Sequence, residues 1–397
     1  MDTSVSVEHA RRVVLEMARA TPAEPVALAD AVGRTLAGPV VSRGPQPPFD
    51  ASAMDGFAVR WADLGAPLPV VGTAHAGDVP EPLAPGTAVA IMTGAPVPRG
   101  ADTVVPVERA TRDGDAVRFD ATPTRGSHIR RAGEALADGA EVLPAGTLIT
   151  PGAVSVLASV GAAHVPVRAR PLVAVVATGD ELVPADRTPG LGQIRDSNGP
   201  GLAAQVVAAG GAVVGLVARD TAADLDRALD EATGADVVVV AGGVSMGERD
   251  RVRPALDARG AEWAFWQVRQ RPGKPLAVGA WDGRPVVGLP GNPVSAAVCF
   301  EVYVRPLLAA MLGRPAEPVT EPAVLAETIP KKAGLHTFAR VTARRDADGR
   351  LHLSPAGAQG SHVAQSLALA DGLAHLPADW PNAPAGAVVA FEQWGWG

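Results

Sequence analysis

Residues 237–250 read VVVVAGGVSMGERD, and this stretch decides how the rest of the chain is interpreted. Four valines predict a strand buried on both faces, and the glycines with Ser245 and Gly247 predict a loop that ends in a helix. Backbone N–H groups in such a loop can point at an anion. The Asp250 carboxylate just behind it can hold a divalent metal against that anion. The segment therefore predicts a site for a phosphate-bearing ligand.

Three further loops have the same chemistry, namely residues 178–182 (TGDEL), 271–275 (RPGKP) and 289–295 (LPGNPVS). Lys274 is one of only three lysines in a chain that otherwise uses arginine for its basic residues. A compact ammonium group is a common phosphate partner, so we interpret this lysine as a ligand contact rather than a surface residue retained by chance.

The residues around these loops alternate between apolar runs and helical patterns. Strands are predicted at 172–177, 212–217, 237–241, 263–268, 276–278 and 286–288, and helices at 202–209, 221–232, 252–258 and 293–312. Such alternation is typical of a doubly wound, mostly parallel α/β sheet. The loops TGDEL and GGVSMGERD then follow the carboxyl ends of strands, where such sheets bind ligands.

The remaining segments have a different character. Periodic apolar residues predict a helix at 5–18, and Leu28, Val32 and Leu36 predict a second helix. From about residue 43 to 140, short β-prone runs separated by Gly and Pro predict a small β domain, and residues 318–397 predict another. A helical run at 154–160 would return the chain to its N-terminal helices, which would make the first β domain an insertion.

Composition excludes several classes of protein. The net charge of −7 argues against a general nucleic-acid binder. A single cysteine, Cys299, excludes an internal disulfide and a cysteine-based metal cluster, and it fits a reducing cytosol. No uninterrupted apolar run approaches the length of a membrane span, and the N-terminus lacks a signal-peptide core. We expect a soluble cytoplasmic protein.

One other catalytic motif is present in the same stretch of sequence. Neither a dinucleotide-binding G-x-G-x-x-G nor a P-loop matches, but residues 243–247 (GVSMG) fit the G-x-S-x-G of a serine hydrolase. Its histidine would have to be a residue such as His336 or His362, which lie outside the α/β region. Carboxylates on loops are equally open to two interpretations, because each can be a helix cap or turn residue instead of a metal ligand; they are Asp55, Asp180, Glu181, Asp196, Asp220 and Asp250.

Eight motifs occur in an order that resembles one family. They are PPFDASAMDGFAVR, IMTGAPVP, IRRAGE, TGDEL, GQIRDSN, GGVSMGERD, RPGKP and GLPGNPVSA, and the chain resembles the molybdopterin molybdenumtransferases, relatives of the gephyrin C-terminal region. The resemblance implies four domains: residues 1–43 with 141–168, an inserted β domain at 44–140, an α/β domain at 169–316 and a β-barrel-like domain at 317–397. It also implies a homodimer, in which Asp55 and Thr93 of one chain face the α/β domain of the other.

The implied reaction inserts molybdenum from molybdate into adenylylated molybdopterin and releases AMP, with Mg²⁺ as cofactor. Transient contact with the adenylyltransferase that makes the substrate is also implied, and nucleic-acid and membrane partners are not. The resemblance and the residue chemistry together assign catalytic roles to Asp55, Asp220, Lys274 and Arg271, and metal binding to Asp180, Glu181 and Asp250. They assign substrate contacts to Thr93, Glu134, Thr178, Gly179, Asp196, Gly242, Gly243, Ser245, Gly247, Pro290, Gly291, Asn292, Pro293 and Ser295.

Two positions depart from the family pattern. Ala135 follows Glu134 where the family often has aspartate, and Arg271 stands where it often has lysine. The second change keeps the charge but replaces a point-like ammonium with a fork of donors. Two alternatives remain open beside the insertase: a molybdopterin-binding scaffold without turnover, and an insertase for tungstate, which forms a similar tetrahedral dianion.

Overall fold

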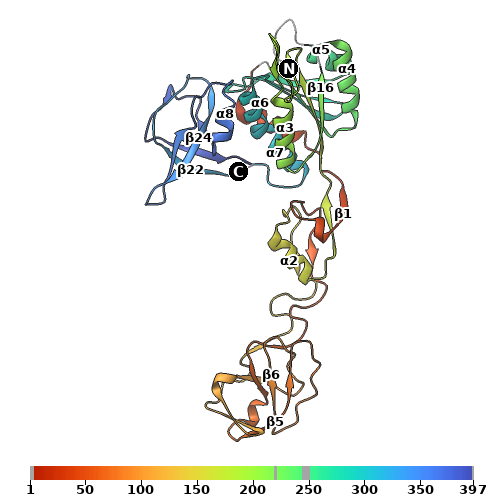
Figure 1. Cartoon of the computed structure of the whole chain (residues 1–397), viewed down its shortest axis with the longest axis vertical. Helices are drawn as coiled ribbons and strands as arrows, with labels where there is room; N and C mark the ends of the chain where they lie inside the picture. The colour runs from red at the N-terminus through yellow and green to blue at the C-terminus, as the bar shows by residue number, and fades with distance from the viewer. Residues whose placement is uncertain (1–3, 219–220, 244–250, 396–397) are drawn as a thin grey trace. The chain divides into compact units, whose positions relative to one another are not determined.

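The computed structural model describes residues 4–218, 221–243 and 251–395 (Figure 1). The chain divides into two compact units. The first comprises Met1–Glu24, Gly33–Ala37 and Pro166–Gly397, and the second comprises Pro25–Val32 and Gly38–Val165. The second unit is therefore an insertion, in sequence, between the N-terminal helix and the main sheet of the first. Strands β1 (Ala23–Ala27) and β12 (His164–Arg168) pair with each other where the chain passes between the units.

The first unit is built around a six-stranded sheet. Its order is β16 (Ala212–Ala218), β13 (Leu172–Thr178), β17 (Val237–Ala241), β21 (Arg284–Leu289), β20 (Pro275–Trp281) and β18 (Glu262–Gln267). The pairings from β16 to β21 are parallel, and β20 and β18 add antiparallel pairings at one side. These pairings confirm the predicted mostly parallel sheet. Its apolar runs are buried on both faces, as in other sheets of this kind.

Helices cover both faces of this sheet (Figure 1). Alternate residues of β13 and β17 point to opposite faces and so enter two separate cores. One core holds α1 (Val7–Glu16), α3 (Asn198–Ala208), α6 (Pro293–Cys299) and α7 (Arg305–Met311), and the other holds α4 (Ala222–Glu231) and α5 (Val252–Ala258). The N-terminal cap of α4 is Thr221, whose hydroxyl accepts a 3.2 Å hydrogen bond from Asp224 N.

The predicted long helix at 293–312 is interrupted by a π-helical segment, Phe300–Val304, that joins α6 to α7. The whole stretch Pro293–Met311 is long and apolar enough to cross a membrane, but 83% of its most apolar window is buried inside the fold. Burial of that extent is what the core helix of a globular domain shows.

A five-stranded barrel completes the first unit. Strands β24 (His336–Arg345), β25 (Leu351–Pro355), β22 (Thr320–Leu325), β28 (Val388–Gln393) and β26 (Gly372–Leu376) are neighbours in that order, and β26 pairs back with β24. Strand β19 (Gln270–Arg271) runs parallel to β24, pairing Gln270 with His336 and Arg271 with Thr337. The RPGKP turn is thereby attached to the barrel. Smaller elements here are α8 (Gln365–Leu369), β23 (Ile329–Pro330) and β27 (Asn382–Ala383).

The second unit is mainly β structure, as predicted. Its main sheet has the order β7 (Thr103–Pro106), β4 (Gly56–Val59), β6 (Ala88–Ile91), β5 (Leu68–Ala74), β9 (Ala116–Phe119) and β8 (Ala110–Asp113). Two short antiparallel pairs accompany it: β3 (Ala51–Ser52) with β10 (Ile129–Arg130), and β2 (Val40–Val41) with β11 (Glu141–Leu143). The predicted helical run near 154–160 is α2 (Pro151–Ser159), capped by Thr150.

The predicted second helix is wrong. Only one 3₁₀ turn, Leu28–Asp30, forms there, and Leu36 instead makes a β-bridge with Val167. Gly33 adopts φ +78°, a left-handed conformation that breaks a helix, and Val32 is 53% exposed. The four-residue spacing of the apolar side chains was therefore not the mark of a helical face.

Candidate functional site

A cavity of ≈ 360 Å³ lies at the carboxyl ends of β13, β17 and β21. The chain leaves β13 toward β16 on one side and later returns to β17 on the other, so this is the switch point where doubly wound sheets bind ligands. The cavity brings together ten of the predicted site residues: Thr178, Gly179, Glu181, Asp196, Gly242, Gly243, Pro290, Gly291, Asn292 and Pro293.

The glycines after β17 allow the backbone to approach its neighbours closely. Gly242 and Gly243 have φ of +93° and +61°. A Cβ on Gly242 would lie 2.7 Å from Thr178 O, and one on Gly243 would lie 2.6 Å from Val252 Cγ2. The Oγ1 of Thr178 is buried and has no hydrogen-bond partner among the described residues. An orphaned hydroxyl beside a bare backbone loop suits contact with a polar ligand.

The opposite wall comes from the loop before α6. Asn198 Nδ2 donates a 2.7 Å hydrogen bond to Gly291 O, which ties this loop to α3. Pro293 occupies the first turn of α6, and Asn292 makes no side-chain capping bond there. Ser295, a predicted substrate contact, is instead buried in α6 and does not line the cavity.

In the part of the chain that the structure describes, two carboxylates line the cavity, those of Glu181 and Asp196. Asp196 Oδ1 accepts a 2.9 Å bond from Gly199 N, so the predicted capping role is present together with a place in the cavity. Asp180 follows the same strand as Glu181 but is not among the lining residues. Four predicted site residues lie outside the described residues, and they are Asp220, Ser245, Gly247 and Asp250.

The cavity can be tested for its fit to Mg²⁺. No group of three or more His, Cys, Asp or Glu side chains is gathered around a potential metal position in the parts of the chain that the structure describes. Mg²⁺ normally takes one or two carboxylates, with ligand phosphates and waters completing its octahedron. Glu181 fits that requirement, and a phosphate beside two carboxylates needs a cation to offset the repulsion.

The RPGKP turn is held by the buried side chain of Gln270, which was not predicted from the sequence. Gln270 Nε2 donates to Pro272 O at 3.1 Å and to Gly273 O at 3.2 Å, and Tyr303 OH donates to Gln270 Oε1. Lys274 and Arg271 themselves are exposed, and the next residue in the chain, Pro275, lines the cavity. Gln270 therefore sets where the turn presents its two cations.

A second missed residue is Arg340, whose side chain is buried in the barrel. Its Nε donates to Ser366 Oγ at 2.9 Å and its Nη2 to Ala358 O at 3.2 Å. Burial, together with the positive charge of Arg271, lowers the pKa of this guanidinium to about 10. An arginine within the apolar run Phe338–Val341 was the available sequence signal. The loop that it holds also meets the α/β core, because Val294 N donates to Ser361 O at 3.2 Å.

A separate polar cluster lies in the second unit. Asp55 Oδ1 accepts hydrogen bonds from both Oγ1 and N of Thr93, each 2.7 Å long. These bonds hold the pKa of the Asp55 carboxyl below its usual value. Glu134 Oε2 accepts a 2.8 Å bond from Arg131 N. The two hydrogen bonds join the turn that carries Asp55 to the turn that carries Thr93, so the two residues form one cluster.

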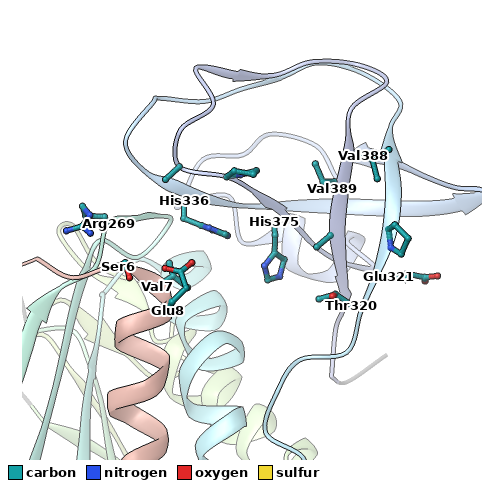
Figure 2. Close-up of a pocket in the computed structure, with 14 residues that line it drawn as sticks. Ser6, Val7, Glu8, Arg269, Thr320, Glu321, His336, His375, Val388 and Val389 are labelled. Carbon is teal, nitrogen blue, oxygen red and sulfur yellow. The ribbon is translucent and has the colours of Figure 1, made fainter.

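A larger cavity, ≈ 660 Å³, lies between α1 and the barrel (Figure 2). Figure 2 shows His336 and His375 facing it from the barrel and Glu8 from α1. The pKa of His336 is lowered to about 4, mainly by burial and to a smaller extent by the charge of His375. His336, one histidine that a serine hydrolase would have required, thus lines a cavity that shares no lining residue with the one at the switch point.

Comparisons with known proteins cover almost the whole chain. Three family models match: "MoeA N-terminal region (domain I and II)" at residues 5–161, "Probable molybdopterin binding domain" at 174–310, and "MoeA C-terminal region (domain IV)" at 322–394. The chain is 40% identical to molybdopterin molybdenumtransferase 2 of Mycobacterium tuberculosis, over 96% of this chain and 97% of the relative. It is 34% identical to the molybdopterin molybdenumtransferase of Haemophilus influenzae, over 98% of each chain.

A solved structure is also similar. The molybdopterin biosynthesis MoeA protein of Pyrococcus horikoshii OT3 superposes with a TM-score of 0.86 at 27% identity, covering 99% of this chain and 100% of that one.

Proposed function

The chain belongs to the molybdopterin molybdenumtransferase family, and we propose that it inserts molybdenum from molybdate into adenylylated molybdopterin with release of AMP. A transferase role in molybdenum cofactor biosynthesis follows from that membership. The observation that supports the finer reaction is the cavity at the switch point, which is lined by two left-handed glycines, two carboxylates and Thr178, whose hydroxyl has no hydrogen-bond partner among the described residues. A phosphate-bearing ligand with a bound cation complements this combination of groups.

In this proposal the cavity holds the phosphates of the substrate. Backbone groups of Gly242 and Gly243 and the hydroxyl of Thr178 contact them, and Glu181 would hold Mg²⁺. The ion, when bound, offsets phosphate charge and favours departure of AMP. Asp180 and Asp250 would hold the ion together with Glu181, and Ser245 and Gly247 would contact the phosphates.

The cations of the RPGKP turn serve the other anion. Lys274 and Arg271 project from a turn whose next residue lines the cavity, and Arg340 contributes a further positive charge close to Arg271. Molybdate is a dianion, and bringing it to an already anionic substrate requires fixed positive charge. We assign Lys274 and Arg271 to molybdate, with Arg340 acting only through its charge, while the dithiolene of the substrate supplies the sulfur ligands.

The second unit contributes through a dimer in this proposal. Asp55, Thr93 and Glu134 belong to a unit that is separate from the cavity, and a homodimer would let them complete the site of a partner chain. Asp55, fixed by Thr93, orients water or molybdate there, and we assign Asp220 a similar role. The protein works in the cytosol, where the single buried cysteine stays reduced, and receives its substrate from the adenylyltransferase.

The test is AMP release from adenylylated molybdopterin by the purified protein with Mg²⁺. Molybdate-dependent release, together with formation of active cofactor, is the expected result. Release that depends on tungstate and not on molybdate would assign the enzyme to the other metal. Tight binding without release under either oxyanion would show that the protein is a scaffold. Glu181→Gln should lower release and raise the Mg²⁺ requirement, and Glu262→Gln, on an exposed strand position, is its matched control.

A further inference from the structure

A cavity of ≈ 520 Å³ lies in the first unit, at the end of α3 remote from the switch point. Ala209, which follows the last residue of α3, lines this cavity, whereas Asn198, the first residue of α3, lines the cavity at the switch point. Its other walls are the π segment with α7, the chain that leads from α7 into the barrel, and β28. The two cavities share no lining residue among those described, so a ligand here would bind apart from the proposed reaction.

Two arginines bring their guanidinium groups together at the end of α3. Arg305 Nη1 donates to Ala208 O at 3.5 Å, and a Cβ on Gly210 would lie 3.4 Å from Arg314 Nη2. Both arginines line the cavity. The pKa of Arg314 is lowered by burial, and then by the positive charges of Arg170 and Arg305. The guanidinium groups are therefore close enough to repel each other.

The described surroundings of these arginines offset only part of their charge. Arg305 Nε donates to Glu301 Oε2 at 2.7 Å, so one carboxylate stands against the charges of Arg170, Arg305 and Arg314. Burial raises the pKa of Glu301, which therefore supplies at most one negative charge. The carbonyl end of α3 adds about half a negative charge. Positive charge remains for an anion to neutralise.

Three further carboxylates line the cavity, but none of them is committed to the two arginines. Glu321 accepts a 2.7 Å hydrogen bond from Arg345 Nη2, and Glu392 Oε2 lies 2.8 Å from His375 Nε2. Glu317 is exposed, so water screens its charge. An external anion therefore complements the arginines better than the acidic side chains already present.

Both guanidinium groups keep donors for such an anion. Arg305 Nη2 is buried and has no hydrogen-bond partner among the described residues. Arg314 donates through Nε to Thr35 Oγ1 at 2.6 Å and through Nη2 to Gly33 O at 3.3 Å, which leaves its Nη1 without an acceptor in the described chain. Guanidinium donors bind carboxylate and phosphate oxygens well, because they present fixed, charge-assisted hydrogen bonds.

We propose that this cavity binds a small organic oxyanion, either a carboxylate or a phosphate monoester, carried on an apolar body. Arg305 and Arg314 bind the charged group. The apolar body contacts the remaining walls, which include Pro306, Pro315, Pro318, Val319 and Phe391. Val319 is 90% exposed, so an apolar side chain waits for cover at the mouth of the cavity. A few polar groups in a mainly apolar pocket are the usual composition of a small-molecule site.

Substitutions at Arg314 separate its charge from its shape. Arg314→Gln removes the charge, and Arg314→Lys keeps it. Arg344, an exposed arginine of β24, lies outside the cavity, so Arg344→Gln is the matched control. If Arg314→Gln fails to fold, Ala309→Leu fills the cavity from its α7 side.

Calorimetric titrations with phenyl phosphate, benzoate and inorganic phosphate test the proposal. The wild type should bind at least one organic anion more tightly than inorganic phosphate, and the preferred organic anion identifies the charged group. Arg314→Gln should weaken that binding by about tenfold or more, and Arg314→Lys by less, because one charge-assisted contact is lost or weakened. Arg344→Gln should bind as the wild type does.

Three results would overturn the assignment: no binding of either organic anion by the wild type, an affinity for inorganic phosphate equal to that for the organic anions, or an unchanged affinity in folded Arg314→Gln. The proposed reaction would stand in each case, since AMP release from adenylylated molybdopterin is measured separately.

Discussion

Thr93 and Asp55 form a hydrogen-bonded pair in the second unit, and the proposed reaction gives Asp55 a catalytic role. Two hydrogen bonds from Thr93 keep the pKa of Asp55 low, so the carboxylate stays charged under mildly acid conditions. Removing the hydroxyl in Thr93→Val raises that pKa. If the charged form is needed, the acid limb of the pH profile for AMP release should move to higher pH.

The profile should be measured for Thr93→Val, for Asp55→Asn and for Thr111→Val, an exposed threonine of the same unit. Asp55→Asn should reduce AMP release by about 100-fold or more, because it removes the charge and keeps the shape. Thr111→Val should behave as the wild type. An acid limb that stays in place in Thr93→Val would show that Asp55 does not act as the anion.

His336 predicts how stability depends on pH. Its pKa is about 4 in the folded chain against its usual 6.5. Between these values the unfolded chain binds the proton and the folded chain does not, so the free energy of unfolding falls as pH falls from 6.5 toward 4. From pH 7 to 4.5 the loss from this one residue is about 2 kcal/mol.

Urea unfolding of the wild type and of His336→Phe over that pH range measures the effect. Between pH 7 and 4.5 the free energy of unfolding of His336→Phe should fall by about 2 kcal/mol less than that of the wild type. His75→Phe, which changes an exposed histidine, is the control and should lose as much stability as the wild type over this pH range. Parallel curves for the wild type and His336→Phe would contradict the shift.

The site residues that sequence could predict were those with local signatures. Thr178, Glu181 and Gly242 follow apolar strands directly, and strand ends in a doubly wound sheet meet at one edge, so their convergence was foreseeable. Gln270 and Arg340 were missed because their roles depend on partners distant in sequence, namely Tyr303 for one and Ser366 for the other.

At the scale of elements, the RPGKP turn depends on the absence of a side chain at Gly273. Gly273 and Gly334 have φ of +84° and +85°, so alanine at either carries a similar backbone strain of about 1 kcal/mol. A Cβ on Gly273 would in addition lie 2.2 Å from Cys299 Sγ, whereas one on Gly334 would meet nothing within 4 Å. Gly273→Ala should therefore cost about 1–3 kcal/mol more than Gly334→Ala.

Denaturant midpoints of the two variants test this difference. Adding Cys299→Ala to Gly273→Ala should recover part of the loss, because it removes the atom that the new methyl group meets. AMP release should fall with Gly273→Ala and remain with Gly334→Ala, since only the first displaces Lys274. Equal stabilities of the two alanine variants would show that packing beneath the turn is not tight.

Helices and strands were predictable where the apolar residues followed a single regular spacing along the chain. The strands of the sheet are continuous apolar runs and helix α1 has a regular apolar face, and these predictions are confirmed. The helix expected from Leu28, Val32 and Leu36 did not form, because Gly33 and the pairing of Leu36 with Val167 outweigh a spacing shared by only three side chains. The π segment at 300–304 had no sequence signature that the apolar period could reveal.

At the scale of the whole molecule, a shared active site makes a prediction about mixed dimers. Asp55 and Lys274 lie in different units, and in the proposed homodimer each active site takes one from each chain. Asp55→Ala and Lys274→Ala should each be inactive alone. In a mixed dimer, one site carries both substitutions and the other carries neither.

Coexpression of the two variants in equal amounts should therefore restore activity to about a quarter of the wild type, because half of the dimers are mixed and each has one intact site. Mixing two differently tagged copies of one variant is the control and should restore nothing. No recovery from the pair of variants would place the whole site within one chain. The four-domain boundaries remain a prediction at this scale.

The inserted second unit also sets the order in which the chain can fold as it is synthesised. Helix α1 leaves the ribosome before the second unit, but Val7, Ala10 and Val14 are buried in a core with Val268, Tyr303 and Phe338, which are made much later. The second unit has its own cores and is translated in between, so it can fold while α1 is still unpartnered. A nascent chain arrested before the barrel thus exposes the apolar face of α1, and release of such a chain creates a substrate for chaperones and proteases.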